Sequence, residues 1–380
     1  MDFQLTEEQV MIKNMVREFA EKEIAPLAEE IDATDQFPSD IFKRMGELGL
    51  FGIPFAEAYG GSGGDYLSLL IALEEIARVS GSVAIIMDAQ TSLCCEPIYL
   101  FGTEAQKQKY LHPLARGEKI GAFGLTETQA GSDAGSTRTR AVRDGDEWAI
   151  NGEKLFITNG SLADVLVITA KTDPDQGTRG ISSFIIEKGT PGFQVGRDEK
   201  KMGLKGSVTS QLFFENCRIP LANLLGKENE GFKQFLTTLD AGRLAISAMA
   251  VGLAQGALDK AVAYAKERVQ FNQPIAQFQA IQWMVADMVT EIEAARMLVY
   301  RGAWLKGQGL RFTKEAAMAK LFATEASEHV CYKAIQIHGG YGYMREYAVE
   351  RMYRDQRLCA IGEGTNEIQR LVIARQVLGL

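Results

Sequence analysis

The chain has 380 residues, of which 46% are hydrophobic and 24% charged, as in folded globular proteins. This length exceeds one ordinary core, so we expect two or three domains. With 41 basic and 49 acidic residues, the net charge is −8 and basic residues form no long cluster, which disfavours nucleic acid as a partner. We also expect no membrane span, because no apolar run is long enough. The acidic, polar N-terminus favours a bacterial-type cytoplasmic protein or, alternatively, a processed organellar one.

The cysteines and histidines form no recognisable metal site. The five cysteines lack the CxxC spacing of zinc sites, and the three histidines are not paired as HExxH. We therefore predict no metal and no disulfide framework. The phosphate-binding patterns GxxxxGK[ST] and GxGxxG are absent as well, so any nucleotide cofactor must be held by other means.

Residues 1–118 have the pattern of a helical domain. Thr6 and Gln9 form a capping box, followed by apolar residues at helical spacing. Further helices are predicted over residues 38–49, 66–80 and 83–101.

Residues 119–228 change to short β-rich runs separated by Gly, Asp, Asn and Pro. This pattern is typical of an antiparallel β-barrel or sandwich. The predicted strands are Glu147–Ile150, Lys154–Thr158, Val165–Thr169, Ile181–Glu187, Phe193–Val195 and Thr209–Phe214.

Residues 229–380 return to helical periodicity, with long helices predicted near 230–267, 274–307 and 313–338. Long antiparallel helices of this kind usually form a four-helix bundle. The predicted fold class is therefore α+β and mainly α: an N-terminal helical domain, a middle β domain and a C-terminal bundle.

One carboxylate near the C-terminus stands out. Glu363 lies between Gly362 and Gly364, where the backbone can bend sharply and approach a ligand. Alternatively, the same residues are an ordinary helix start, with Thr365 as the cap and Glu367 in the first turn.

Six segments, in order, give the whole chain a resemblance to the acyl-CoA dehydrogenases, flavoproteins that oxidise acyl-CoA thioesters. They are Phe123–Asp133, Lys154–Gly160, Asp240–Arg243, Arg268–Gln279, Gln336–Arg354 and Ile361–Arg370. The chain departs from the family pattern at Thr128, Asn272 and Ala348, where the family has proline, glycine and proline.

The resemblance implies an FAD-dependent enzyme in which Glu363 removes the α-proton of the thioester while the β-hydrogen leaves as hydride to the flavin. The product is a 2-enoyl-CoA, and the electrons pass to an electron-transfer flavoprotein. Some relatives carry the base on the helix at the position of Gly242, which here has no side chain.

The resemblance also assigns the FAD contacts, some of them to a neighbouring subunit, and so implies a homotetramer built as a dimer of dimers. The residues implied to hold FAD are Phe123, Leu125, Thr126, Ser132, Phe156, Thr158, Arg268, Gln270, Gln279, Gln336, Gly339, Gly340, Thr365 and Glu367. The residues implied to bind the substrate are Ser132, Asp240, Arg243 and Gly364. Without the resemblance, Asp240 and Arg243 would be interpreted as a helix-surface ion pair.

Asp88 interrupts an apolar helical run in the region that forms the acyl pocket in this family. A carboxylate facing an acyl chain is costly unless it is used. Asp88 could be an additional base, suited to alicyclic thioesters such as cyclohexane- or cyclohexene-carbonyl-CoA. The alternative is that it points to solvent or caps a neighbour. Two further alternatives concern the whole chain: a relative that uses another electron route, such as an oxidase or a reductase, and a non-catalytic scaffold that binds CoA or flavin.

Overall fold

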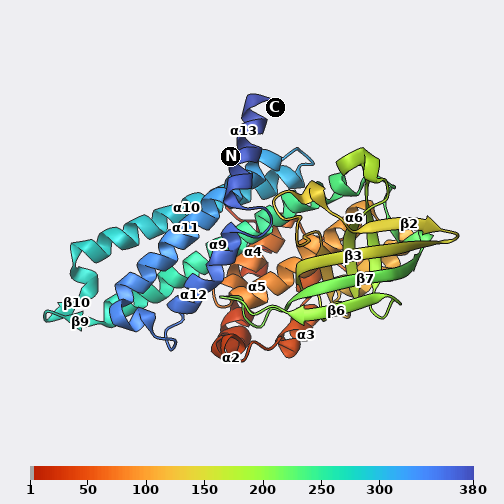
Figure 1. Ribbon diagram of the computed structural model, residues 1–380. Helices are drawn as coiled ribbons and strands as arrows, with labels where there is room; N and C mark the ends of the chain where they lie inside the picture. Colours follow the sequence, from red (N-terminus) through yellow and green to blue (C-terminus); the bar gives the residue numbers. More distant parts are fainter. Residues whose placement is uncertain (1–3) are drawn as a thin grey trace.

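The computed structural model describes residues 4–380 and has three parts. Helices from the two ends of the chain pack together, and a β-sheet lies against one side of them (Figure 1). This arrangement confirms the predicted α+β class, with helical domains at both ends and a β domain in the middle.

The N-terminal helices surround α4 and α5, which are almost fully buried. Asp65 caps α4 by accepting a hydrogen bond from the Ser68 N–H at 2.7 Å, and it also accepts one from Gln9 at 2.8 Å. The helix predicted over 83–101 is interrupted by a π-helical segment, η5. The elements are α1 (Glu7–Phe19), α2 (Ala28–Thr34), α3 (Ser39–Glu47), α4 (Tyr66–Ala77), α5 (Gly81–Asp88), η5 (Ala89–Cys95), α6 (Glu96–Phe101), α7 (Glu104–Gln106) and α8 (His112–Ala115).

The middle domain is an eight-stranded sheet whose order is β6-β7-β3-β2-β4-β5-β8, with β1 paired to β4. Most pairs are antiparallel as predicted, but β4 pairs in parallel with both β1 and β2. The two strands predicted over 147–158 are one strand with bulges, β3. The strands are β1 (Gly121–Gly124), β2 (Arg140–Asp144), β3 (Glu147–Thr158), β4 (Val165–Lys171), β5 (Ile181–Glu187), β6 (Phe193–Asp198), β7 (Thr209–Pro220) and β8 (Leu224–Leu225).

A buried ion pair joins β3 to the loop after β1. Lys154 and Glu127 have almost no exposed side-chain surface, and Nζ lies 2.8 Å from Oε1. Lys154 also donates to the Leu125 carbonyl at 3.1 Å and to Thr169, and Glu127 accepts from Thr137 and from the backbone N–H groups of 138 and 139. Burial lowers the pKa of Lys154 to about 8 despite the facing carboxylate. Burial works against the charged form of Glu127 too, yet Lys154 and the other donors lower its pKa to about 2. The pair therefore fixes the backbone at the end of β1.

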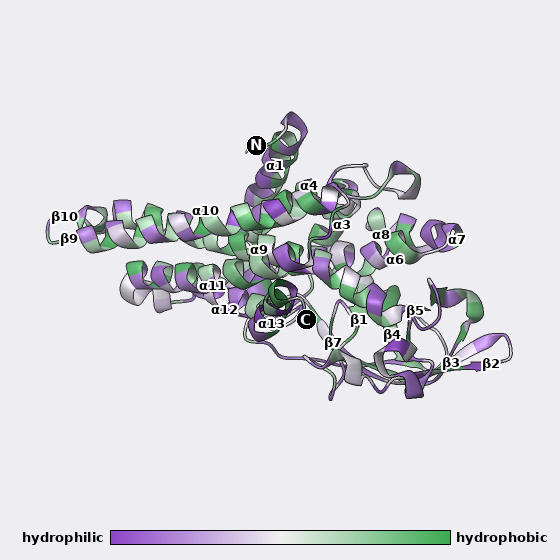
Figure 2. Ribbon diagram, turned by 90° about the horizontal axis from the view of Figure 1, so that it is seen from above, coloured by the Kyte–Doolittle hydropathy of each residue, from purple (hydrophilic) through white to green (hydrophobic). Residues whose placement is uncertain are grey.

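The C-terminal helices form an elongated arm that ends in a small hairpin, on the opposite side from the sheet (Figure 2). Among the described helices, only α9 is long and apolar enough to cross a membrane, although no such segment was expected from the sequence. Within its apolar window, 94% is buried inside the protein, as in the core helix of a globular protein. The elements are α9 (Gly231–Glu267), β9 (Val269–Gln270), β10 (Gln273–Pro274), α10 (Gln279–Gly307), α11 (Thr313–His338), η11 (Gly339–Tyr343), α12 (Val349–Gln356), η12 (Arg357–Ala360) and α13 (Asn366–Leu378).

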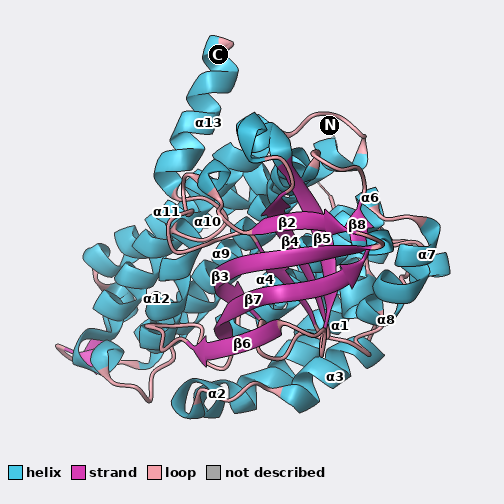
Figure 3. Ribbon diagram, turned by 45° about the vertical axis from the view of Figure 1, so that its right-hand side comes forward, coloured by secondary structure: helices cyan, strands magenta, loops and turns pink. Residues whose placement is uncertain are grey.

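The hairpin and the C-terminal helix are the two projecting features. Phe271 and Asn272 form the turn between β9 and β10, both with positive φ (+52° and +64°). Asparagine tolerates this left-handed backbone better than most residues, so Asn272 can occupy the position where relatives have glycine. Helix α13 extends away from the body of the molecule (Figure 3).

We expect Asp65→Ala to lower the free energy of unfolding by about 1–2 kcal/mol, because α4 loses its N-cap acceptor. Denaturant unfolding measures the change. Asp40→Ala, which removes an exposed carboxylate from the first turn of α3, is the control and should change stability by less than about 0.5 kcal/mol. Equal losses in the two variants would contradict the capping role.

We expect Lys154→Met to lower the free energy of unfolding by roughly 3–5 kcal/mol, because Glu127 is left buried without its counter-ion. The double variant Glu127→Gln/Lys154→Met should lose less than Lys154→Met alone, since no uncompensated charge remains. Denaturant unfolding of both proteins tests this order, and a greater loss in the double variant would contradict it.

Candidate active site

The Glu363 side chain starts from a left-handed turn between η12 and α13. Its φ is +56° and that of Gly364 is +91°. Thr365 caps α13 by accepting a hydrogen bond from the Ile368 N–H, which is the helix-start role expected of it. Gln369 donates to the carbonyls of Gly364 (2.8 Å) and Glu363 (3.4 Å). The turn is thus both a helix start and a support that directs the carboxyl away from α13.

The Glu363 carboxyl packs against α9 at Gly242. A Cβ added at Gly242 would lie 2.3 Å from Glu363 Oε2 and 2.8 Å from Leu93 Cδ2. Both carboxyl oxygens are buried without a hydrogen-bond partner among the described residues. The space that a side chain at 242 would fill therefore holds the carboxyl of Glu363.

Asp88, at the end of α5, contacts the carboxyl of Glu363. It is fully buried, and neither of its carboxyl oxygens has a fixed hydrogen-bond donor among the described residues, so it neither points to solvent nor caps a neighbour. Burial raises the pKa of Asp88 to about 6, partly offset by contact with the carboxyl of Glu363. Burial, followed by the Asp88 charge, raises the pKa of Glu363 well above its usual value.

Two buried cationic side chains lie near the Glu363 turn, and each of them is bound to another group. Lys320 on α11 donates to Asn366 Oδ1 at 3.0 Å, and burial lowers its pKa to about 8. Arg243 on α9 pairs with Asp240 at 2.7 Å and reaches the Glu363 carbonyl at 3.5 Å. Because both cations bind the backbone or another side chain, neither neutralises the carboxyl of Glu363 directly.

The Asp240–Arg243 ion pair is not the exposed helix-surface pair that the sequence would suggest without the family resemblance. The Arg243 side chain is only 6% exposed, and Asp240 also accepts a hydrogen bond from Thr313 of α11 at 2.6 Å. Burial raises the pKa of Asp240 in spite of Arg243. The pair joins α9, α11 and the Glu363 turn, with Gly364 beside it.

A second left-handed residue lies on the β domain. Phe156 has φ +59° at a bulge of β3 and is 60% exposed, an unusual state for an aromatic residue. Leu155 donates its N–H to the Thr126 carbonyl at 2.8 Å, which ties this bulge to Leu125 and Thr126. Phe123 stacks on Phe235 of α9 with ring centroids 4.2 Å apart. The expected flavin-wall residues therefore lie near the ends of β1 and β3, where Thr158 is the last residue of β3. Ser132 is exposed in the loop between β1 and β2.

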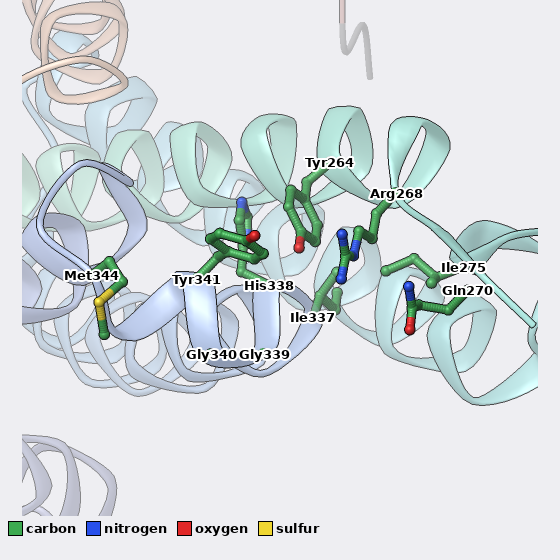
Figure 4. Close-up of a pocket in the computed structure, with 10 residues that line it drawn as sticks. All are labelled: Tyr264, Arg268, Gln270, Ile275, Ile337, His338, Gly339, Gly340, Tyr341 and Met344. Atoms are coloured by element: carbon green, nitrogen blue, oxygen red, sulfur yellow. The ribbon is translucent and has the colours of Figure 1, made fainter.

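Four further expected FAD residues lie at the far end of the arm, around a cavity of about 440 Å³ (Figure 4). Arg268, Gln270, Gly339 and Gly340 line it, whereas Gln279 and Gln336 are exposed but not among the lining residues. Arg268 lies over the Tyr341 ring, 5.5 Å from its centroid. A Cβ at Gly339 or Gly340 would meet open space, and Gly339 has φ +60°, so this backbone is open to a ligand.

This cavity and the ends of β1 and β3 together fit a dinucleotide divided into two parts. Exposed amides with an arginine suit a phosphate, and an exposed aromatic ring with backbone groups suits a flavin ring. Gln270 of the hairpin lines the cavity, and the hairpin and the sheet lie at opposite ends of the fold (Figure 1). A single chain therefore does not bring the two parts together. Thr365 and Glu367 lie apart from both, at the start of α13.

Sequence reasoning missed the Lys154–Glu127 pair, although both residues lie in segments that carry the family resemblance. Lys154 occupies an inward-facing position of β3, like Trp148 and Ile150. A lysine at such a position needs a buried partner, and this signal could have found Glu127. It also missed Lys320 and Gln369, whose partners lie far along the chain or in the turn itself.

Comparison with known proteins agrees with these features. The acyl-CoA dehydrogenase N-terminal, middle and C-terminal domain models match residues 6–118, 122–217 and 229–378. The short-chain specific acyl-CoA dehydrogenase of Clostridium acetobutylicum is 53% identical, with 99% of this chain and 100% of that protein covered. The acryloyl-CoA reductase (NADH) of Anaerotignum propionicum is 50% identical, with 100% and 96% covered. A chain in the solved structure of the electron transferring flavoprotein of Acidaminococcus fermentans has a TM-score of 0.99 and 52% identity, with 100% of both chains covered. The chain belongs to the acyl-CoA dehydrogenase family of FAD-dependent oxidoreductases.

Proposed function

We propose that Glu363 is the base that removes the α-proton of a short-chain acyl-CoA thioester, giving a 2-enoyl-CoA. The observation that carries the proposal is the buried Glu363 carboxyl, which has no hydrogen-bond donor among the described residues and starts from a left-handed turn beside Gly242. A carboxylate in such a pocket has a raised pKa, which makes it a stronger base.

The chain's own groups bind and orient the substrate around this base. The N–H of Glu363 can polarise the thioester carbonyl, since the turn presents its backbone beside the carboxyl. Asp240, Arg243, Gly364 and exposed Ser132 bind the coenzyme A moiety. Asp88, with the buried side chains around it, closes the inner end of the pocket to water. FAD, when bound against Phe156 and Thr126, supplies the acceptor for the β-hydride.

The assembly that we propose is a homotetramer built as a dimer of dimers, in the cytoplasm, with an electron-transfer flavoprotein as electron acceptor. The two separated parts of the FAD site support an oligomer, since each chain needs another to complete it. Exposed apolar side chains on α10, including Trp283 (64%) and Trp304 (57%), offer a surface for packing. The similarity to a chain solved with an electron transferring flavoprotein supports the partner.

The same site can run in the opposite direction. The acryloyl-CoA reductase relative at 50% identity supports this direction. A protonated Glu363 is the form that returns a proton to the α-carbon, and burial favours that form.

A second candidate substrate class is alicyclic thioesters, with Asp88 as an additional base. The supporting observation is that the Asp88 carboxyl is buried in the pocket of Glu363 without a fixed partner among the described residues. This position suits removal of a proton from a ring carbon beyond the α and β positions.

An anaerobic titration of the holoenzyme tests the proposal. The flavin band is followed while butyryl-, octanoyl-, isobutyryl-, glutaryl-, cyclohexanecarbonyl- and cyclohexenecarbonyl-CoA are added in turn. We expect bleaching by butyryl-CoA. Bleaching by the cyclic thioesters alone would favour the second candidate, and no bleaching by any thioester would overturn the substrate class. A protein that folds without retaining flavin would favour the non-catalytic scaffold.

We expect Glu363→Gln to reduce kcat for dehydrogenation by about 10²–10⁴-fold, because the amide cannot accept the α-proton. Flavin content and thermal stability should stay close to those of the parent protein, since the carboxyl makes no fixed hydrogen bond to the described residues. Steady-state rates with butyryl-CoA give the measurement. Activity within a few fold of the parent would remove Glu363 from the role of base.

We expect Gly242→Ala to lower kcat more than it raises KM, because the new methyl group displaces the Glu363 carboxyl and Leu93. Gly256→Ala is not a suitable control, since its added Cβ would meet backbone at 2.1 Å. Gly307→Ala is suitable, because nothing lies within 4 Å of its added Cβ, and it should leave both constants unchanged. Equal kinetics for the parent, Gly242→Ala and Gly307→Ala would show that the space at Gly242 is not needed.

A further inference from the structure

We infer that Asp88 and Glu363 hold one proton between them, and that Asp88 is the positioning residue that sets how readily Glu363 takes up or returns the α-proton. The inference rests on the proposed role of Glu363 and deepens it. It gives Asp88 a function with every substrate, including linear ones, and not only with rings.

The geometry places the two carboxyls in one closed space. The Asp88 and Glu363 carboxyls lie within hydrogen-bonding reach of each other. A Cβ added at Gly242 would lie 2.3 Å from Glu363 Oε2 and 2.8 Å from Leu93 Cδ2, so α9 and η5 close around the Glu363 carboxyl. All four carboxyl oxygens are buried without a fixed donor from the described residues. The Ser92 hydroxyl lies close enough to Asp88 to donate to it, but the Glu363 carboxyl faces that of Asp88. A hydrogen bond between two carboxyls needs a proton on one of them, so a shared proton supplies the donor between the pair.

No uncommitted cation faces the pair from the described elements around it. On α4, Tyr66 donates its hydroxyl to the Ala241 carbonyl at 2.9 Å, and Ser92 of η5 is uncharged. On α6, Glu96 is paired with Lys306 of α10. The cations of α9 and α11 that act on Glu363 are Arg243, which is bound to Asp240, and Lys320, which is bound to Asn366. Burial raises the pKa of the Cys359 thiol on η12, so this group stays neutral.

Two adjacent carboxylates without a counter-ion cannot both ionise at ordinary cost. The pKa of Asp88 is raised to about 6 and that of Glu363 is raised further, in each case chiefly by burial. Near neutral pH the pair therefore carries one proton and one negative charge. The two groups titrate together and not as independent acids.

The shared proton changes the reaction in a defined way. Because the pKa of Glu363 is raised further than that of Asp88, the shared proton lies mainly on Glu363. The Glu363 carboxylate can act as the base once this proton has moved to Asp88 or left the pair. The α C–H bond breaks, its electron pair forms the Cα=Cβ bond, and the proton goes to Glu363. FAD, when bound, would supply the acceptor for the hydride that leaves the β-carbon. When the shared proton is on Asp88, the reaction leaves the pair with two protons and no charge, so no buried carboxylate remains without a counter-ion. In the reverse direction Glu363 returns its proton to the α-carbon.

The test compares Asp88→Asn with the parent holoenzyme, using butyryl-CoA and the pH dependence of kcat/KM. We expect the midpoint for the essential base to fall by about one pH unit or more, because a neutral amide no longer opposes ionisation of Glu363. At a pH below both midpoints, a midpoint that is lower by about one pH unit raises relative kcat/KM about tenfold. Asp88→Ser is a second variant that also lacks the charge and should move the midpoint in the same direction.

Thermal stability gives a readout that does not depend on activity. Because the pKa of Asp88 is raised on folding, its contribution to stability is present at low pH and is lost as pH rises through about 6. Asp88→Asn lacks this loss, so its Tm should exceed that of the parent at pH 8 by more than it does at pH 5.

Asp355→Asn is the matched control. Asp355 is also buried, with its pKa raised by burial to about 6, but it accepts the Leu204 N–H at 2.6 Å and lies on α12. It should leave the kcat/KM midpoint unchanged. An unchanged midpoint in Asp88→Asn, or loss of activity with cyclic thioesters alone, would overturn the shared proton. If the shared proton is overturned but Glu363→Gln is inactive, the proposed function of Glu363 as the base still stands. If Glu363→Gln is active, the proposed function fails together with the shared proton.

Discussion

A carboxyl group held out of water without a donor is the constraint on which this site depends. Burying an ionised carboxylate is costly, and the cost is avoided when the group takes up a proton. The surroundings of Glu363 meet this condition throughout. Gly242 leaves room for the carboxyl, the nearby cations are bound to other groups, and Asp88 supplies a second carboxyl in place of a donor. Each of these features raises the readiness of Glu363 to accept a proton from carbon.

Backbone strain marks both sides of the site. Glu363 and Phe156 are non-glycine residues in the left-handed region, one at a helix start and the other at a bulge of β3. Such conformations cost about 1–3 kcal/mol each and persist only where the surroundings determine them. Gln369 and Arg243 hold the first, and the buried Lys154–Glu127 pair with the Leu155–Thr126 hydrogen bond holds the second. The rigid fold thus presents a carboxyl and an aromatic ring in fixed directions.

Much of the fold could be predicted because its signals are local. Helical periodicity predicted 230–267 and 313–338, which the structure forms as Gly231–Glu267 and Thr313–His338. The π-helical segment η5 (AQTSLCC) inside the predicted 83–101 helix was not predicted from this periodicity. The partners of Lys154 and Asp88 lie far from them along the chain, and a local pattern cannot specify such contacts. Family resemblance supplied Glu363, whereas the burial of Asp88 required the structure.

The length of α9 has a consequence in genetic terms. From Gly242 beside the base to Arg268 at the distal cavity, the helix runs for about 39 Å at 1.5 Å per residue. One gene therefore encodes both the base and the distal FAD-binding cavity. The long helix α9 separates them, and in the proposed oligomer they serve different cofactor sites. When one variant chain is substituted in the arm and another at Glu363, the two substitutions impair different parts of the sites that the two chains form together. Two inactive alleles of this kind can complement each other, although each alone yields no complete site.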